Sequence, residues 1–279
     1  MHALDRRQLL RRIGLAVAAI PLVNLAAACG DDGAPAGPDA TVDPDGPDVQ
    51  DAPPSDWASG GTGAMTDKAT YPDPFATPAV TCIVVGATTE GPCNTPNTDL
   101  DREDISEGLT GLPVRLAIKI TDGSCTPLAG ATVKIWHTDV RGVYSGMTPN
   151  PAFCSENNPE YTSKNFSRGV RTSDANGVVY FDTVYPGWYP GRAIHIHFQV
   201  RDAGGTNYKI SQLFFPESLT QSIFASHVDY TAFGQPNTPN SRDGVWNNVP
   251  AADRDRLMLD IARMTDGAML ASKVVAVTA

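Results

Sequence analysis

Short runs of alternating apolar and polar residues, separated by turn signals, dominate the chain after residue 110. Alternation with period two predicts a half-buried β-strand, because successive side chains point to opposite faces. The run 114–120 alternates Val, Leu and Ile with Arg, Ala and Lys. Similar strand candidates follow at hairpin spacing, namely 131–136, 178–181, 194–200 and 208–215. We therefore expect an all-β, antiparallel β-sandwich rather than alternating βα units.

The segments on either side of these strands differ from them in pattern. A loop-rich N-terminal arm covers 62 to about 105, with one strand candidate at 81–85. Near the other end, Pro250 can start a helix, and Leu257, Ile261 and Met264 recur at helical spacing. We expect this short C-terminal helix to cover the sandwich.

Residues 1–29 predict an export signal. Arg6 and Arg7 precede an apolar run, 13–28, that is too short to span a membrane comfortably and ends in small residues. The arginine pair resembles a twin-arginine export signal. The three alanines before Cys29 resemble a lipobox, in which a lipidated cysteine anchors the protein to a membrane. An ordinary signal peptide with a chance cysteine is the alternative. The expected location is the cell envelope, lipid-anchored or periplasmic.

The segment 30–61 predicts a disordered spacer. It is rich in proline, and between 30 and 60 it contains eight Asp and no Lys or Arg. A single folded domain then follows over 62–279, with its core at about 81–245. The formal net charge of the chain is −10. Such a chain offers no basic surface to a phosphate backbone, so we expect no nucleic-acid partner.

Besides Cys29, the chain contains Cys82, Cys93, Cys125 and Cys154. An even number of cysteines in an exported chain predicts disulfides. Three pairings are possible, and proximity along the chain favours Cys82–Cys93 and Cys125–Cys154. Metal binding by these thiols is the weaker interpretation, because no CxxC spacing occurs.

The segment 192–200 contains the pattern His-x-His within a strand candidate. Strand periodicity places His195 and His197 on one face, roughly 6.5–7 Å apart along the strand. Two imidazoles at that distance can converge on one metal ion. Taken alone, the pattern fits two ordinary surface or core histidines equally well.

Two tyrosines in turns strengthen the metal hypothesis. Tyr144 lies in a turn after the 131–136 strand, and Tyr189 lies in a tight loop just before the His195 strand. Phenolate is a hard oxygen ligand, and two Tyr with two His suit ferric iron better than zinc. A trivalent ion would lower the phenol pKa from about 10 and hold both rings as phenolates. The alternative for each tyrosine is a packed aromatic ring with a hydrogen-bonded hydroxyl.

Several motifs occur in a specific order: GATVKIWHTDVRGVYSG, FSRGVRTSDANGVVYFDTVYPGWYPGR, HIHF and SQLFFP. In this respect the chain from about 81 to 245 resembles the intradiol ring-cleavage dioxygenases, the family of catechol 1,2-dioxygenase and protocatechuate 3,4-dioxygenase. The resemblance implies an immunoglobulin- or prealbumin-like β-sandwich and a non-haem Fe(III) cofactor. It also implies an enzyme of aromatic catabolism. That enzyme uses O₂ to cleave a catechol-type ring between its two hydroxyl-bearing carbons, giving a muconate-type diacid.

The resemblance also assigns roles to residues. By motif, the metal ligands are Tyr144, Tyr189, His195 and His197, with Tyr189 giving way to substrate during catalysis. Arg192 matches the family arginine that stabilises substrate charge, and Gln212 matches a glutamine that supports the site.

The chain departs from the family around the pocket. The segment 89–92 resembles the family's TEGPYY loop, but Cys93 stands where a tyrosine would be. The gap between Tyr189 and His195 is shorter than usual. We expect His137 and Asp139, in the turn before Tyr144, to make hydrogen bonds rather than bind metal.

Two other functions compete with the dioxygenase. One is a non-catalytic β-sandwich binding module on the cell surface, since a fold does not fix a function. The other is a zinc hydrolase built on the His-x-His pattern, which lacks a third His or carboxylate at suitable spacing.

Overall fold

A computed structural model describes residues 56–77, 82–95, 100–202 and 204–278 of this chain. The predicted export signal and Cys29, with nearly all of the predicted spacer, lie outside these ranges. The strands are β1 Pro113–Thr121, β2 Thr132–Trp136, β3 Arg168–Thr172, β4 Val178–Val184, β5 His195–Arg201, β6 Asn207–Phe214, β7 Asp260–Arg263 and β8 Met269–Ala276. The α-helices are α2 Pro151–Cys154, α3 Pro159–Thr162, α4 Glu217–Ser226 and α5 Gly244–Asn247. Short 3-10 turns occupy Thr62–Ala64, Lys68–Thr70, Thr231–Phe233, Asn240–Arg242 and Ala251–Arg256.

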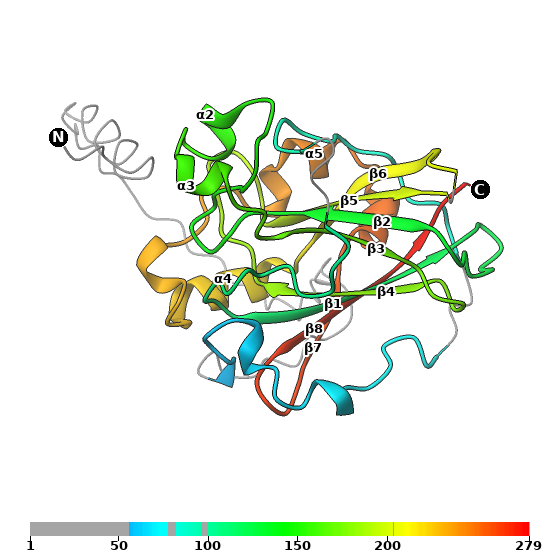
Figure 1. The fold of residues 1–279 in the computed structure, drawn as a ribbon, viewed down its shortest axis with the longest axis horizontal. Helices are drawn as coiled ribbons and strands as arrows, with labels where there is room; N and C mark the ends of the chain where they lie inside the picture. Colours follow the sequence, from blue (N-terminus) through cyan, green and yellow to red (C-terminus); the bar gives the residue numbers. More distant parts are fainter. Residues whose placement is uncertain (1–55, 78–81, 96–99, 203, 279) are drawn as a thin grey trace, which may run out of the picture. The chain divides into compact units, whose positions relative to one another are not determined.

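The strands form two four-stranded sheets, in the orders β4-β1-β8-β7 and β3-β2-β5-β6. Figure 1 shows the second sheet lying over the first, which is a sandwich-like arrangement. Within these sheets β1 and β8 pair in parallel, whereas the other strand pairs are antiparallel. The expectation of a purely antiparallel fold is therefore wrong at one pair. Parallel neighbours need a long connection, and most of the chain lies between β1 and β8.

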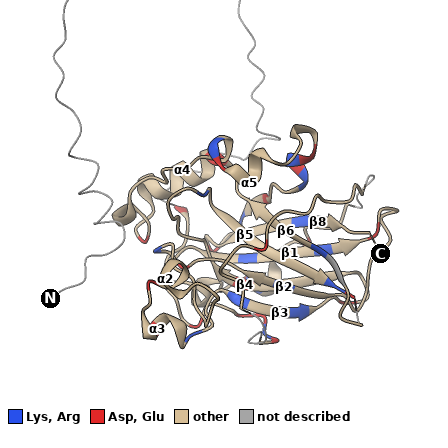
Figure 2. Cartoon of the chain, turned by 90° about the horizontal axis from the view of Figure 1, so that it is seen from above, with Lys and Arg blue, Asp and Glu red and all other residues tan. Residues whose placement is uncertain are grey.

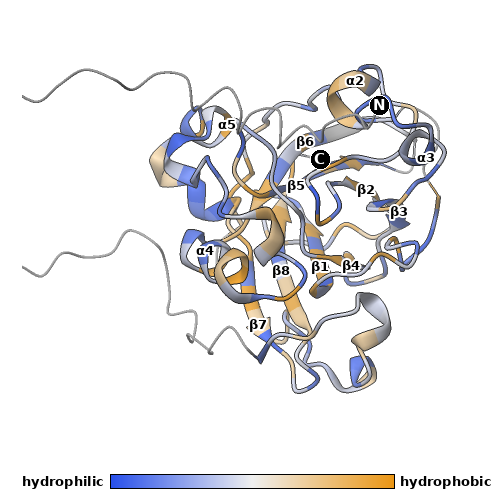
Figure 3. Cartoon of the chain, turned by 90° about the vertical axis from the view of Figure 1, so that its left-hand side faces the viewer, coloured by the Kyte–Doolittle hydropathy of each residue, from blue (hydrophilic) through white to orange (hydrophobic). Residues whose placement is uncertain are grey.

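The core lies between the two sheets. Val114, Leu116 and Ile118 of β1 are fully buried and share one apolar cluster with Ile196 and Phe198 of β5. Figure 3 shows this apolar character along strands of both sheets. Full burial of each such side chain stabilises the folded state by roughly 1.5–3 kcal/mol relative to leaving the side chain exposed. The alternating pattern therefore predicted these strands correctly.

The helices cover the sandwich at two separate places. Figure 2 shows α4 and α5 together on one side and α2 and α3 on another. Helix α4, which the sequence analysis missed, buries Leu219, Ile223 and Phe224. Within the described ranges, no helix is both long and apolar enough to cross a membrane.

The predicted C-terminal helix is wrong. Its place is taken by the 3-10 turn Ala251–Arg256 and the antiparallel pair β7–β8. Leu257 and Leu259 are buried, and around them the chain exchanges backbone hydrogen bonds with Phe214: the Phe214 N–H donates to Leu257 O, and the Leu259 N–H donates to Phe214 O. The apolar residues 257, 259 and 261 also fit period two. Backbone pairing with Phe214, at the end of β6, favours the extended conformation of period two over the helix.

The N-terminal strand candidate is largely absent as a strand. Of 81–85, the structure describes 82–85, where Val84 forms a single bridge with Ala276 of β8.

All four remaining cysteines form disulfides, as predicted, but the predicted pairing is wrong. Cys82 is bonded to Cys125 and Cys93 to Cys154, with Cα–Cα distances of 5.1 and 5.5 Å. The bonded partners are 43 and 61 residues apart in sequence. Closing a longer loop costs only slightly more entropy than closing a short one, so the fold rather than sequence proximity decides which cysteines meet.

Candidate metal and substrate site

Strand β5 brings its two histidines together on one face. His195 and His197 are buried, and their Nε2 atoms lie 3.1 Å apart. The Nδ1–H of His195 donates to the Ala193 carbonyl at 2.7 Å, which leaves a lone pair on its Nε2. The His197 ring stacks on Trp136, with centroids 4.8 Å apart and planes within 8°. Both rings are therefore held in fixed orientations.

A tight turn after β2 places Tyr144 beside these histidines. Asp139 organises the turn, because its Oδ1 accepts the N–H groups of Arg141 and Val143. Its Oδ2 accepts the Arg141 guanidinium. Nearby, His137 Nδ1–H donates to Thr138 O. These contacts confirm the expectation that His137 and Asp139 make hydrogen bonds within the turn.

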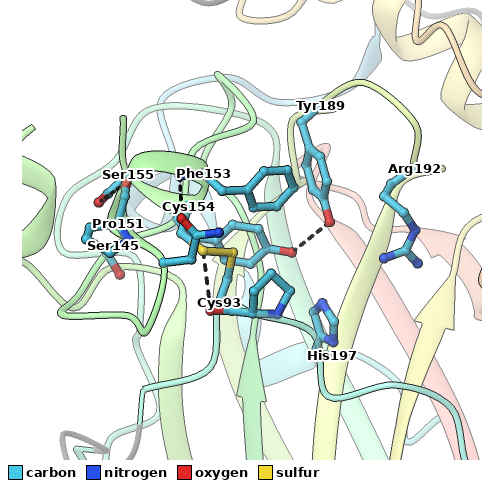
Figure 4. The surroundings of a disulfide bond; sticks show 12 residues. Cys93, Ser145, Pro151, Phe153, Cys154, Ser155, Tyr189, Arg192 and His197 are labelled. Atoms are coloured by element: carbon cyan, nitrogen blue, oxygen red, sulfur yellow. Dashed lines mark hydrogen bonds between the residues drawn. A yellow bond between two sulfur atoms is a disulfide. The ribbon is translucent and has the colours of Figure 1, made fainter. Parts of the chain in front are cut away.

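The loop before β5 supplies Tyr189. Its hydroxyl lies 3.5 Å from that of Tyr144 and 3.4 Å from His195 Nε2. The Tyr144 hydroxyl is also 3.4 Å from His195 Nε2. The structure thus brings together all four side chains that the resemblance names as ligands. Figure 4 shows Tyr189, Arg192 and His197 directed toward a common space.

Arg192 contacts His195 and two further side chains. Its Nη1 is 3.4 Å from His195 Nε2, its Nη2 donates to Gln212 Oε1, and its Nε donates to Asp243 Oδ2 at 2.8 Å. Gln212 Nε2 in turn donates to Thr89 O at 3.1 Å. Arg192 and Gln212 therefore both lie at the site, as the sequence predicts.

Sequence reasoning missed Asp243, which is fully buried. Its position before a short helix is typical of an N-cap, and its Oδ1 accepts the N–H groups of Val245 and Trp246. That signal predicts the cap but not the ion pair with Arg192, which comes from 51 residues away.

Burial controls the protonation of the site. It lowers the pKa of His195 to about 3, with a further contribution from Arg192, and lowers the pKa of His197 well below its usual value. It raises the pKa of Tyr144 well above 10, and it also raises the pKa of Tyr189 despite the opposing charge of Arg192. Without an added cation, the four side chains are therefore neutral at pH 7.

This donor set fits a hard cation. The described residues include no group of three or more His, Cys, Asp and Glu placed to hold a metal, so a site here depends on the phenol oxygens. His195 Nε2 lies within 3.4 Å of both phenol oxygens and 3.1 Å from His197 Nε2, so the four donor atoms converge on it. Imidazole nitrogen with phenol oxygen suits iron.

The segment that resembles the TEGPYY loop reaches this site. A Cβ built on Gly91 would lie 3.2 Å from Cε1 of His197, and Gly91 has a φ of 71°, so glycine suits both this close approach and this backbone conformation. Two residues later, Cys93 shares a small apolar cluster with Trp136, Tyr144, Cys154 and Tyr189. The replacement of the family tyrosine by Cys93 thus places a disulfide beside the site.

Comparisons with known proteins agree with this geometry. A family model described as "Dioxygenase" matches residues 89–232, just over half of the chain. An intradiol ring-cleavage dioxygenase from Tetranychus urticae has a similar structure, with 28% identity and a TM-score of 0.61 over 71% of this chain and 95% of that one. The dioxygenase domain of a carbohydrate-binding fusion protein from Streptomyces sp. SirexAA-E shares the fold, at 20% identity and a TM-score of 0.51, over 70% of this chain and 99% of that one. A search among curated proteins gave no match. The chain therefore belongs to the intradiol ring-cleavage dioxygenase family.

Proposed function

We propose that this protein is a non-haem Fe(III) dioxygenase. It cleaves a catechol-type ring between the two hydroxyl-bearing carbons and releases a muconate-type diacid. The observation that carries this proposal is the convergence of two phenol oxygens and two imidazole nitrogens beside the partly buried guanidinium of Arg192. Family membership supports ring cleavage of a catechol-type substrate, and the donor set supports the metal.

Tyr144, Tyr189, His195 and His197 would hold the iron. When bound, Fe(III) supplies Lewis-acid and redox chemistry that makes the catechol ring reactive toward O₂. Because burial raises the pKa of both phenols, the charge of a bound cation such as Fe(III) would be needed to keep them as phenolates near neutral pH.

Other steps of the reaction depend on the side chains of the protein, which accept a proton, stabilise charge and hold the arginine in position. Tyr189, three residues before Arg192, can as a phenolate accept a proton from a substrate hydroxyl at its oxygen, and the charge of Arg192 favours the phenolate. Arg192 stabilises negative charge that develops on the ring, because its fixed positive charge lies beside the proposed ligands. Gln212 and Asp243 hold the guanidinium so that it need not reorganise during the reaction.

We also propose that the protein is exported and anchored to a membrane by lipid. Both disulfides of the described part favour an oxidising compartment, where such bonds persist. The twin-arginine pattern and the residues around Cys29 supply the route and the anchor.

The function is tested on protein expressed with sufficient iron. We expect bound iron, a red to brown colour from phenolate-to-iron charge transfer, and oxygen uptake with catechols, with a muconate-type diacid found by mass analysis. A colourless protein that holds zinc and takes up no oxygen with any catechol would contradict the proposal.

A further inference from the structure

The disulfide Cys93–Cys154 lies in the wall of the candidate site. Both cysteines are buried, and they pack with Trp136, Tyr144 and Tyr189 in a cluster distinct from the main core. Figure 4 shows the disulfide near Phe153, whose ring lies between the sulfur atoms and Tyr189. Elsewhere, Cys82–Cys125 joins the N-terminal arm to the turn after β1, and Cys125 is half-exposed. The two disulfides therefore have different surroundings.

On one side, Cys154 belongs to the segment that fixes both tyrosines. The Cys154 carbonyl accepts the N–H of Tyr144 at 2.8 Å. The preceding Phe153 presents an edge-on ring to Tyr189, with centroids 5.8 Å apart and planes at 89°. Movement of helix α2 would therefore displace the side chains of both Tyr144 and Tyr189.

On the other side, Cys93 ends the loop that touches His197 and Gln212. Gly91 packs against the His197 ring, and Thr89 O accepts the Gln212 amide at 3.1 Å. The Cys93 carbonyl accepts Nη2 of Arg168 at 2.7 Å, and Nε of the same arginine donates to Ser145 O at 2.8 Å. The loop is thus tied to the Tyr144 turn a second time, without a covalent bond.

We propose that Cys93–Cys154 is a positioning element of the active site. It fixes the 89–93 loop relative to α2, so that the histidine side and the tyrosine side of the pocket keep the separation that a catechol requires. This inference rests on the proposed function. The histidines remain anchored in β5 without the disulfide, so its loss should disturb substrate binding more than metal retention.

The test compares two cysteine pairs in the iron-loaded full chain. C93S/C154S should raise KM for catechol roughly tenfold with a smaller change in kcat, because small displacements of a binding wall weaken productive orientation. It should also shift the visible band, since Phe153 then constrains Tyr189 less. The matched control C82S/C125S should lose thermal stability but keep the wild-type KM and band.

A second measurement covers the case in which C93S/C154S fails to fold. In C82S/C125S only Cys93–Cys154 remains among the described cysteines. A phosphine reduces the disulfide with two electrons and is itself oxidised to the phosphine oxide, while one water molecule supplies the oxide oxygen and the two thiol protons. The thiols are alkylated, the phosphine is removed, and the folded enzyme should then show the raised KM.

Two results would overturn the inference while the wild-type enzyme is active. One is an unchanged KM and band after loss of Cys93–Cys154, and the other is the same KM change in both cysteine pairs. Wild-type protein without oxygen uptake would instead contradict the proposed function, and this inference with it.

Discussion

At the scale of single residues, the carboxylate of Asp243 sets the position of the Arg192 guanidinium. Oδ2 accepts both Arg192 Nε and the Ala193 N–H at 2.8 Å. Burial alone would raise the pKa of Asp243, but the charge of Arg192 and these hydrogen bonds outweigh it and lower the pKa. The carboxylate is therefore ionised at neutral pH and holds the Arg192 cation beside His195.

Asp243→Asn tests this arrangement. The variant keeps a hydrogen-bond acceptor and loses the charge, so we expect kcat/KM to fall about 10- to 100-fold, as for other supporting residues of metal sites. Iron content and colour should stay, because Asp243 contacts no proposed ligand side chain. Steady-state oxygen uptake and metal analysis measure the two effects. Unchanged kinetics, or loss of iron, would refute the assigned role.

The proposed ligation of iron by Tyr144 and Tyr189 can be tested by comparison with a buried tyrosine outside the site. Tyr144→Phe and Tyr189→Phe each remove a proposed phenolate, so each should change the visible band. Tyr185→Phe is the matched control, because Tyr185 is buried and its hydroxyl lies 2.7 Å from Thr220 Oγ1, away from the proposed ligands. Absorption spectra of the iron-loaded variants decide the matter. A band that changes equally in all three variants would contradict phenolate ligation.

His137 gives a prediction for pH. Burial lowers the pKa of His137 to about 4 in the folded protein, against 6.5 ordinarily. As pH falls, the unfolded chain binds this proton first, so the stability that neutral His137 provides above pH 6.5 is lost as pH approaches 4. The loss is roughly 3 kcal/mol by linkage. His137→Gln should flatten this part of the pH profile, measured by denaturant unfolding of iron-loaded protein. An equally steep profile would rule out His137 as its source.

At the scale of elements, the loop 185–192 packs on the Tyr144 turn through Gly187. The Gly187 N–H donates to Asp139 O at 2.8 Å, and Thr138 Oγ1 donates to Gly187 O. A Cβ at this position would lie 2.3 Å from Val140 O, which is backbone and cannot move aside alone. This close approach determines whether Tyr189 reaches Tyr144.

Gly187→Ala should therefore separate the two segments. We expect lower iron content and at least tenfold lower activity, since the phenol oxygens no longer converge. Gly244→Ala is the control, because nothing lies within 4 Å of its added Cβ and alanine favours the helix α5. Metal analysis and oxygen uptake of both variants are compared. Wild-type iron content and activity in Gly187→Ala would show that the loop tolerates the methyl group.

At the scale of the whole molecule, the sequence assigns export and anchoring to segments that lie outside the described residues. We propose that Cys29 is lipidated and that the following acidic segment acts as a tether. Cys29→Ser should then release protein into the soluble fraction while activity stays unchanged, as checked by fractionating cells and assaying oxygen uptake. One acyl chain binds a membrane only marginally, so stable anchoring requires more than one. Retention of the variant on membranes would count against lipidation.

Sequence alone determined the strands around the site and the orientation of its histidines. The alternation in β1, and the placement of His195 and His197 on one face of β5, follow from the two-residue period of the backbone, which is a local property. The motifs around Tyr144 and Tyr189 also identified the remaining proposed ligands, because each lies in a short turn of recognisable sequence.

Only the tertiary structure decided which distant segments meet. The parallel pairing of β1 with β8, the backbone pairing of Leu257 and Leu259 with Phe214 in place of a helix, the cysteine pairing and the Asp243–Arg192 ion pair all join residues far apart in sequence. Local pattern does not encode such contacts, because closing a long loop costs little more entropy than closing a short one. Burial of the whole apolar surface selects among the possible partners, and that selection exists only once both sheets have packed.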